Sequence, residues 1–266
     1  MAVRTVLALC LALLTIGAAV APAAEQRGVE LLAKKLAEFK GAERGQTLPV
    51  SDAAVARAFP AHAFYVVRFR QYPMAEMPPA PLTANNLFVV KPDGAVEHLP
   101  DATALEHFFR ETLAPVTAER EARDAAAAWL RLTQEFHQDS FFEFSVPLNA
   151  IRVAPTETGG LQATGRAAVT PRGGNTGAIV ATLNFDHAGK LVSVSETATV
   201  HKGVRPICQA TKLLDPDPVV RQMAEQSIVV MGSAAREYLT EQRAKASPEL
   251  QHAIDRIWQR ILAEHR

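Results

Sequence analysis

Cysteine is nearly absent from this sequence of 266 residues, which contains two, Cys10 and Cys208. Cys10 lies in an apolar N-terminal stretch with the features of a signal peptide, so the mature chain would keep Cys208 alone. One thiol excludes a disulfide within the chain, and the core must then stabilise the fold. Two interpretations of Cys208 stay open: a small buried hydrophobic residue, or a nucleophile beside His201 whose orienting partner is not evident in the sequence.

The sequence also lacks an excess of charge of either sign, with 28 basic and 28 acidic residues. Proteins that bind nucleic acid or anionic membranes carry a basic patch, and none is visible here. Aromatic residues make up only 6% of the chain and do not cluster with the basic ones, which excludes a stacking platform for single strands. We therefore expect neither a nucleic-acid partner nor a charged membrane surface.

Long hydrophobic runs are missing outside the N-terminus. There, a basic start at Arg4 precedes an apolar stretch over residues 6–20 and the small-x-small sequence Ala21-Pro22-Ala23. This order is typical of a signal peptide, predicted here over residues 1–23. It predicts a periplasmic or secreted chain with no membrane contact after cleavage. An uncleaved anchor is the alternative for the same segment.

Catalytic and metal-binding motifs are absent too. The eight histidines form neither H-x-x-x-H nor H-E-x-x-H, there is no G-x-S-x-G, and the glycine pairs do not precede a helix. We therefore predict no catalytic residue, no metal ion and no cofactor, and a protein that is not an enzyme.

Met74 and Met77 lie in a proline-rich segment, residues 71–83. A pair of thioethers can bind Cu(I) when a third soft ligand is present, and His62 is a candidate for that role. The alternative is that the methionines pack back on the core or meet a partner. Met74 and Met77 are accordingly candidate partner contacts.

The strongest pattern is a predicted hairpin over residues 177–200. Apolar residues alternate with polar ones along both arms, and Asp186 to Lys190 supply turn chemistry with a glycine suited to positive φ. The side chains on one face of the hairpin are predicted to be buried, and those on the other face to be exposed to solvent. The buried row is Ile179, Ala181, Leu183 and Phe185 on the first arm and Val192, Val194, Ala198 and Val200 on the second.

Glu196 interrupts the apolar row of the second arm, and a lone buried carboxylate is costly. One explanation is a bulge or a strand end beyond the core. The other is an acid in a pocket with a raised pKa. In that case Trp129 and Phe185, on the same core face, would line a ligand-binding pocket with Glu196.

A long helix is predicted over residues 118–137, capped by Thr117 and carrying an alanine-rich stripe with Trp129. Four predicted strands follow it. Residues 51–113 show a similar order of predicted elements: helix, strand, hairpin and helix. This order resembles cystatin-like and nuclear-transport-factor-2-like architectures. The predicted fold class is α+β: an antiparallel sheet meander packed on a long helix, with a duplication left open, followed by a small C-terminal α-helical segment.

The C-terminal segment changes to helix formers. It has an Asp-Pro start, a Val-Arg pair, an alanine one turn on, a glycine between two helices and a closing leucine: Asp217-Pro218, Val220-Arg221, Ala224, Gly232 and Leu239. Residues 211–245 thus resemble one HEAT-like repeat unit. In related repeat proteins such helices present surfaces to protein partners, which makes Arg221 and Arg236 candidate contacts. A final amphipathic helix begins at Ser247-Pro248.

The sequence thus divides into a signal peptide (1–23), an N-terminal α+β region (24–116), a helix-plus-sheet region (117–205) and a HEAT-like segment (206–266). We expect an exported, non-enzymatic scaffold that binds a protein or peptide through the sheet and the C-terminal helices. The first alternative is a ligand-binding or enzymatic pocket that uses Glu196. The second is a regulator of an exported enzyme that makes contact through residues 71–83. The sequence leaves the oligomeric state open.

Overall fold

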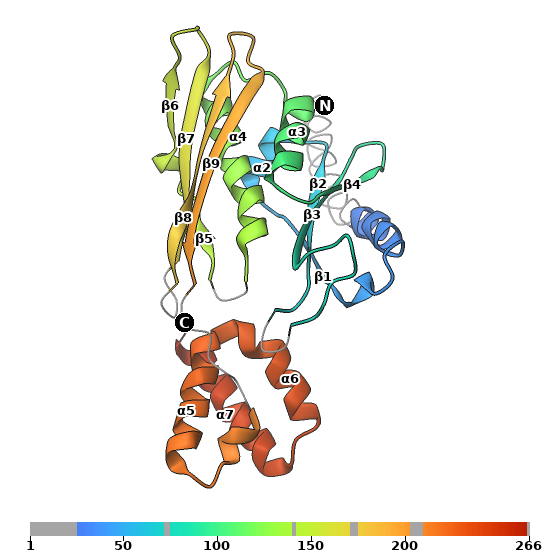
Figure 1. Ribbon diagram of the computed structural model, residues 1–266, viewed down its shortest axis with the longest axis vertical. Helices are drawn as coiled ribbons and strands as arrows, with labels where there is room; N and C mark the ends of the chain where they lie inside the picture. The colour runs from blue at the N-terminus through green and yellow to red at the C-terminus, as the bar shows by residue number, and fades with distance from the viewer. Residues whose placement is uncertain (1–25, 72–74, 140–141, 171–174, 203–209, 265–266) are drawn as a thin grey trace, which may run out of the picture.

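The computed structural model describes residues 26–71, 75–139, 142–170, 175–202 and 210–264 (Figure 1). It confirms the predicted fold class, because helices combine with two antiparallel sheets and a helical segment ends the chain. The predicted signal peptide, Met74 and Cys208 lie outside the described residues. Among the described residues, no helix combines the length and the hydropathy needed to cross a membrane.

The first sheet is a four-stranded antiparallel meander in the order β1-β2-β3-β4. Its strands are β1 (Gln46–Pro49), β2 (Ala63–Arg68), β3 (Asn85–Val90) and β4 (Val96–Leu99). Alternation along β2 buries both faces. Tyr65 and Val67 pack with Leu32 of a helix over residues 26–36, whereas Phe64 and Val66 belong to the core on the opposite face.

A layer of helices lies between the two sheets and consists of α2 (Ala53–Ala58), α3 (Ala102–Thr112) and α4 (Glu119–Thr133), which continues as the 3-10 turn η2 (Gln134–His137). Two predicted caps were wrong by one residue. Asp52 rather than Ser51 caps α2, because its carboxylate accepts hydrogen bonds from the backbone of the first turn. α4 begins after Ala118, since the Glu121 carboxylate reaches back to the backbone nitrogens of Thr117 and Ala118.

The second sheet runs in the order β5-β7-β8-β9, and β6 also pairs with β7. Its strands are β5 (Phe144–Ser145), β6 (Arg152–Pro155), β7 (Leu161–Val169), β8 (Thr176–Phe185) and β9 (Leu191–His201). The predicted hairpin is confirmed as β8 and β9, with Gly189 at φ 77° in the turn. The buried row of β8 is as predicted, but the row predicted on β9 is not buried: Val192 and Ala198 are exposed, and Val194 and Val200 are half-buried. Val192 lies beside the point where the ladder slips, at Asn184/Phe185.

Close packing of α4 on this sheet depends on small residues on both sides. The inner face of α4 is rich in buried alanines, and Gly165 of β7 lies opposite them. A Cβ atom at Gly165 would come within 2.8 Å of Leu130 Cδ1. The core that α4 organises draws residues from both α+β regions, so the helical layer joins the two sheets.

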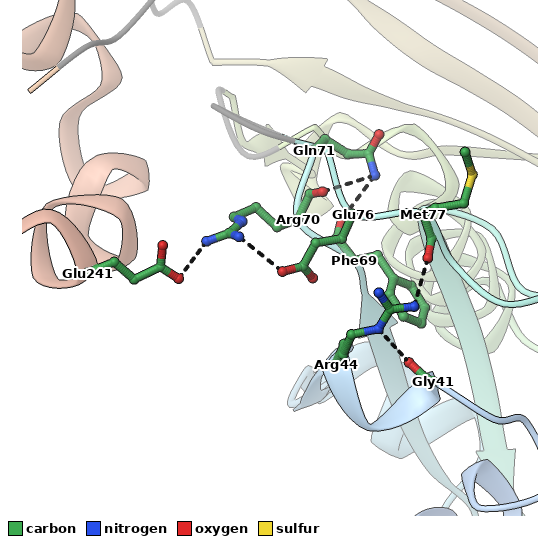
Figure 2. Close-up of polar contacts among 8 residues, drawn as sticks. All are labelled: Gly41, Arg44, Phe69, Arg70, Gln71, Glu76, Met77 and Glu241. Carbon is green, nitrogen blue, oxygen red and sulfur yellow. Dashed lines mark hydrogen bonds and ion pairs between the residues drawn. The ribbon is translucent and has the colours of Figure 1, made fainter.

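The C-terminal helices form a separate group below the sheets in Figure 1, with a hydrophobic core of their own. They are η4 (Ala210–Leu214), α5 (Pro218–Met231), η5 (Gly232–Ala235), α6 (Arg236–Ala244) and α7 (Pro248–Glu264). As predicted, Asp217 caps α5, Pro218 occupies its first turn and Gly232 ends it. Arg70, just after β2, connects the body to this group through an ion pair with Glu241 of α6 at 2.8 Å (Figure 2).

Candidate functional site

A cleft of about 520 Å³ opens where η2, β9 and the adjoining ends of β2 and β3 meet. Three segments distant in the sequence contribute its walls. The lining combines a small apolar surface with amide and ionisable groups: Gln71, Ala84, Asn85, Phe136, His137, Gln138, Asp139, Ala198, Val200 and Lys202. This mixture is typical of a binding site, in which apolar walls hold a ligand and a few polar atoms orient it.

Glu196 lies next to this cleft, in the middle of β9 opposite Ala181. Its side chain is 15% exposed and its two oxygens have different partners. Trp129 donates its indole N–H to Oε2 at 2.7 Å. Oε1 is 3.9 Å from Nε2 of His137, and the His137 side chain lines the cleft. Glu196 therefore connects the buried indole of α4 to the wall of the cleft.

Glu196 is a stabilised carboxylate rather than a protonated acid. Burial opposes ionisation of Glu196, but its polar neighbours His137, Thr133 and Trp129 outweigh burial and hold the pKa of Glu196 below its ordinary value. The explanation that invoked a raised pKa is therefore wrong. The explanation that invoked a bulge or strand end is wrong as well, because the ladder is regular on both sides of Glu196 and the slip lies nearer the turn.

The predicted pocket of Glu196, Trp129 and Phe185 is brought together only in part. Trp129 contacts Glu196, but Phe185 is buried at the hairpin end of β8, where it faces Leu161 and Leu191 in the ladder. None of the three lines the cleft itself. His137, which does, was missed as a site residue because the helical pattern ends there and gives no sign of what η2 meets in space.

Two ion pairs lie on the segments that form the cleft, and they differ in burial. Arg68 of β2 pairs with Glu135 of η2, whose carboxylate is buried, so this pair locks the first sheet against the helical layer. Lys202 Nζ lies 3.9 Å from Asp139 Oδ2. Because the Lys202 side chain is 61% exposed while that of Asp139 is 10% exposed, the lysine is the loosely held partner.

The two cleft amides on the β2–β3 side donate their N–H groups to backbone carbonyls. Asn85 donates from Nδ2 to the carbonyl of Gln138 at 2.6 Å. Gln71 donates from Nε2 to the carbonyls of Phe69 and Arg70, at 3.2 and 3.4 Å (Figure 2). An amide whose nitrogen is engaged in this way keeps its carbonyl oxygen as an acceptor.

β9 is an edge strand of the second sheet, since β8 is its one partner among the described strands. In an antiparallel ladder, successive residues direct their backbone groups alternately toward the partner and away from it. Val194 donates its backbone N–H outward, to Glu106 of α3. By alternation, the backbone N–H and C=O groups of Glu196, Ala198 and Val200 also point outward, beside the cleft.

The candidate partner contacts are not gathered in one place. Met77 is 80% exposed, and its carbonyl accepts a hydrogen bond from Nη2 of Arg44 at 3.2 Å (Figure 2). Arg221 donates to the carbonyls of Asp215 and Pro216, so its guanidinium fastens the start of α5. Arg236 is exposed at the start of α6. Met74 lies outside the described residues.

α5 has an exposed apolar stripe that the sequence reading did not isolate. Val219, Met223 and Val230 follow helical spacing and are all exposed, while Ala224 and Ile228 on the opposite side enter the C-terminal core. Both faces of α5 carry apolar residues, so the sequence alone does not show which face is buried and which is exposed.

His62, the candidate third copper ligand, stacks edge-on against Phe59 and Phe108, and burial lowers its pKa. Within the described part of the chain, no group of three or more His, Cys, Asp or Glu side chains has the arrangement of a metal site. No family model, curated protein or solved structure matches the chain.

Proposed function

We propose that this chain is an exported, non-enzymatic binding protein that receives an extended peptide segment of a protein partner in the cleft beside β9. The observation that carries the proposal is the coincidence of an open strand edge with a cavity. Outward backbone groups of β9 can pair with an added strand, and the adjoining cleft can hold a side chain of that strand.

The dimensions and the chemistry of the cleft agree with such an occupant. About 520 Å³ accommodates a few residues rather than a whole helix or domain. The apolar wall of Phe136, Ala198 and Val200 suits aliphatic side chains, and the amide oxygens of Gln71 and Asn85 suit peptide N–H groups. The signal-peptide pattern of residues 1–23 supports export.

A proline substitution tests this proposal directly. Proline is tolerated on an edge strand where the N–H faces outward, yet it removes the donor that an added strand needs. The full mature chain is used to select binders from a random twelve-residue peptide library. Ala198→Pro is expected to abolish binding of the enriched peptides, whereas Thr199→Ala, at an adjacent position whose backbone bonds to β8, is expected to retain it.

Circular dichroism must show that both variants keep the fold. The proposal fails if no peptide is enriched, or if enriched peptides bind folded Ala198→Pro as well as they bind the wild type. A milder variant, Val200→Glu, places a charge on the apolar wall without altering the strand backbone, and it should weaken the same peptides.

The exposed stripe of α5 supports a second protein-binding surface, in keeping with the HEAT-like pattern of residues 211–245. Val219 and Met223 do not contribute to the C-terminal core, so their side chains are available to a partner. A protein that binds there should no longer bind the variant Val219→Ser/Met223→Gln but should still bind Gln222→Ala. Equal binding to the wild type and to both variants would reject this surface.

A further inference from the structure

We propose that the outer face of the second sheet binds an acidic polysaccharide, a polymer of sugars that carry carboxylates. The outer face is the side of β6 to β9 that is turned away from α4, which packs against the other side (Figure 1). The cleft lies on the inner side of β9, where Ala198 and Val200 line it. The inference therefore concerns a second site and goes beyond the proposed peptide binding.

The strands contribute no carboxylate to the outer face. The chain has 28 acidic residues among 266. Within the described residues of β5 to β9 there is a single acid, Glu196, and its side chain turns inward to the indole of Trp129. Because side chains alternate along a strand, its neighbours Ser195 and Thr197 point outward. An anionic ligand on this face would therefore meet no repulsion from the strands.

The acids of the adjoining described loops lie at the ends of the ladder. Glu143 precedes β5, and its carbonyl accepts the N–H of Thr170 beyond the last residue of β7. Glu157 lies in the turn between β6 and β7. Asp186 accepts backbone N–H groups of its own turn, and Asp139 borders the cleft. The middle of the described sheet is thus free of negative charge on its outer side.

Two arginines supply positive charge on the β6–β7 side of this face. Arg152 of β6 lies opposite Thr164 of β7, and Arg166 follows two residues later on the same face. Diagonal neighbours of this kind are about 7–8 Å apart. Both arginines are exposed, and neither guanidinium has an ion pair or a hydrogen bond to the described chain. Two such groups suit the carboxylates of a ligand, which a guanidinium binds through two parallel hydrogen bonds.

Neutral polar side chains occupy the neighbouring positions. Gln162 donates from Nε2 to Oδ1 of Asn184 at 2.8 Å, and Asn184 donates from Nδ2 to Oγ of Ser193 at 3.0 Å. The hydroxyls of Thr164 and Thr182 share a hydrogen bond at 3.0 Å. Two hydroxyls joined by one hydrogen bond keep one O–H proton to donate and lone pairs to accept. Sugar hydroxyls donate and accept in the same way, so they match this surface.

These features favour an acidic polysaccharide over other polyanions. The outward positions of the described strands carry no phenylalanine, tyrosine or tryptophan, so the bases of a nucleic acid would find no ring on which to stack. Two arginines are also fewer than the basic cluster that holds a protein on an anionic membrane. A polymer of uronic acids offers carboxylates to the arginines and hydroxyl groups to the neutral polar side chains.

The probe is an oligogalacturonate of defined length, and its carboxyl-reduced form is the neutral counterpart. Isothermal titration calorimetry on the full mature chain at low ionic strength measures both Kd values. The acidic form should bind and the neutral form should not, and added salt should weaken the binding. Arg152→Gln/Arg166→Gln should raise the Kd about tenfold or more. The matched control is Arg120→Gln/Arg260→Gln, which removes the same charge from exposed arginines of α4 and α7 and should leave the Kd unchanged.

A third variant tests the hydroxyl groups. Thr164→Val keeps the branched shape of the side chain and its preference for a strand, but it removes the hydroxyl beside Arg152. We expect the Kd to rise about threefold, the effect of one neutral hydrogen bond. Circular dichroism must show that every variant keeps the fold. An unchanged Kd in Thr164→Val would contradict the role given to the hydroxyl groups.

The remaining outcomes decide the inference separately from the proposed function. It is overturned if the oligogalacturonate does not bind, if its neutral form binds equally well, or if the control variant loses as much affinity as Arg152→Gln/Arg166→Gln. Tighter binding of oligothymidylate or of dextran sulfate would also overturn it, in favour of nucleic acid or sulfate. Ala198→Pro should still bind the oligogalacturonate, and Arg152→Gln/Arg166→Gln should still bind the selected peptides. Loss of the oligogalacturonate in folded Ala198→Pro would place it at the cleft and reject the outer face.

Discussion

The hydrogen bond from Trp129 to Glu196 offers the sharpest test of the charge placed beside the cleft. Its 2.7 Å length and its ionised acceptor make it a charge-assisted bond, worth about 1.5–3 kcal/mol in the interior of a protein. Glu196→Gln keeps an acceptor for the indole but loses the charge, and the charge supplies about half of the free energy of such a bond. We therefore expect this variant to lose about 1 kcal/mol of stability.

Trp129→Phe removes the donor and part of a fully buried ring, so its total cost should be larger, about 2–4 kcal/mol. The double variant isolates the interaction from the loss of packing. We expect a coupling free energy of about 1 kcal/mol between the two sites. Native-state hydrogen exchange of β8 and β9 amides is the appropriate assay, because a signal confined to these strands excludes unfolding of the C-terminal helices, which have their own core.

The pH dependence of stability tests whether Glu196 is ionised in the folded protein. The pKa of Glu196 is lower in the folded state than in the unfolded chain, so its contribution to stability is complete above the unfolded pKa. The contribution is lost as the pH falls through the folded pKa. The stability difference between wild type and Glu196→Gln should therefore shrink in acid. A coupling below about 0.3 kcal/mol at pH 7, or one that does not change in acid, would refute the assigned carboxylate.

Other expectations follow from single contacts. Gly165→Ala should destabilise the body by about 1–3 kcal/mol in chemical denaturation, because the new Cβ lies 2.8 Å from Leu130 Cδ1; an unchanged midpoint would contradict the packing. Arg68→Met should cost about 3–5 kcal/mol by leaving buried Glu135 unpaired, and Arg68→Met/Glu135→Leu should recover part of the loss. Glu241→Gln should change the stability of either core by less than about 1 kcal/mol, because its ion pair with Arg70 is exposed. It should nevertheless broaden the distance distribution from small-angle scattering, since Arg70 links the two parts of the molecule through this pair. An identical distribution would argue against that link.

The sequence predicted the elements that depend on local pattern. Alternation in residues 177–185 identified the buried row of β8, and Asp186 with Gly189 identified the turn. Asp217, Pro218 and Gly232 likewise marked the start and end of α5, because capping chemistry acts over a few residues.

The site could not be predicted in the same way, because its contacts join segments far apart in the chain. Trp129 and Glu196 are 67 positions apart, and Asn85 and Gln138 are 53 positions apart. An acid in an apolar row has the same local pattern whether it is protonated or satisfied by an indole. Only the crossing of α4 and η2 with β9 decides between these cases, and that crossing depends on the packing of the whole core.

Hydrogen exchange along β9 tests the central claim most directly. The outward amides of Glu196, Ala198 and Val200 should exchange quickly in the free chain, whereas those of Ser195, Thr197 and Thr199, which bond to β8, should be protected. Saturation with a selected peptide should protect the outward set and leave the inward set unchanged. If the peptide binds and the outward amides of β9 still exchange as fast as before, the cleft beside this strand is not where the partner docks.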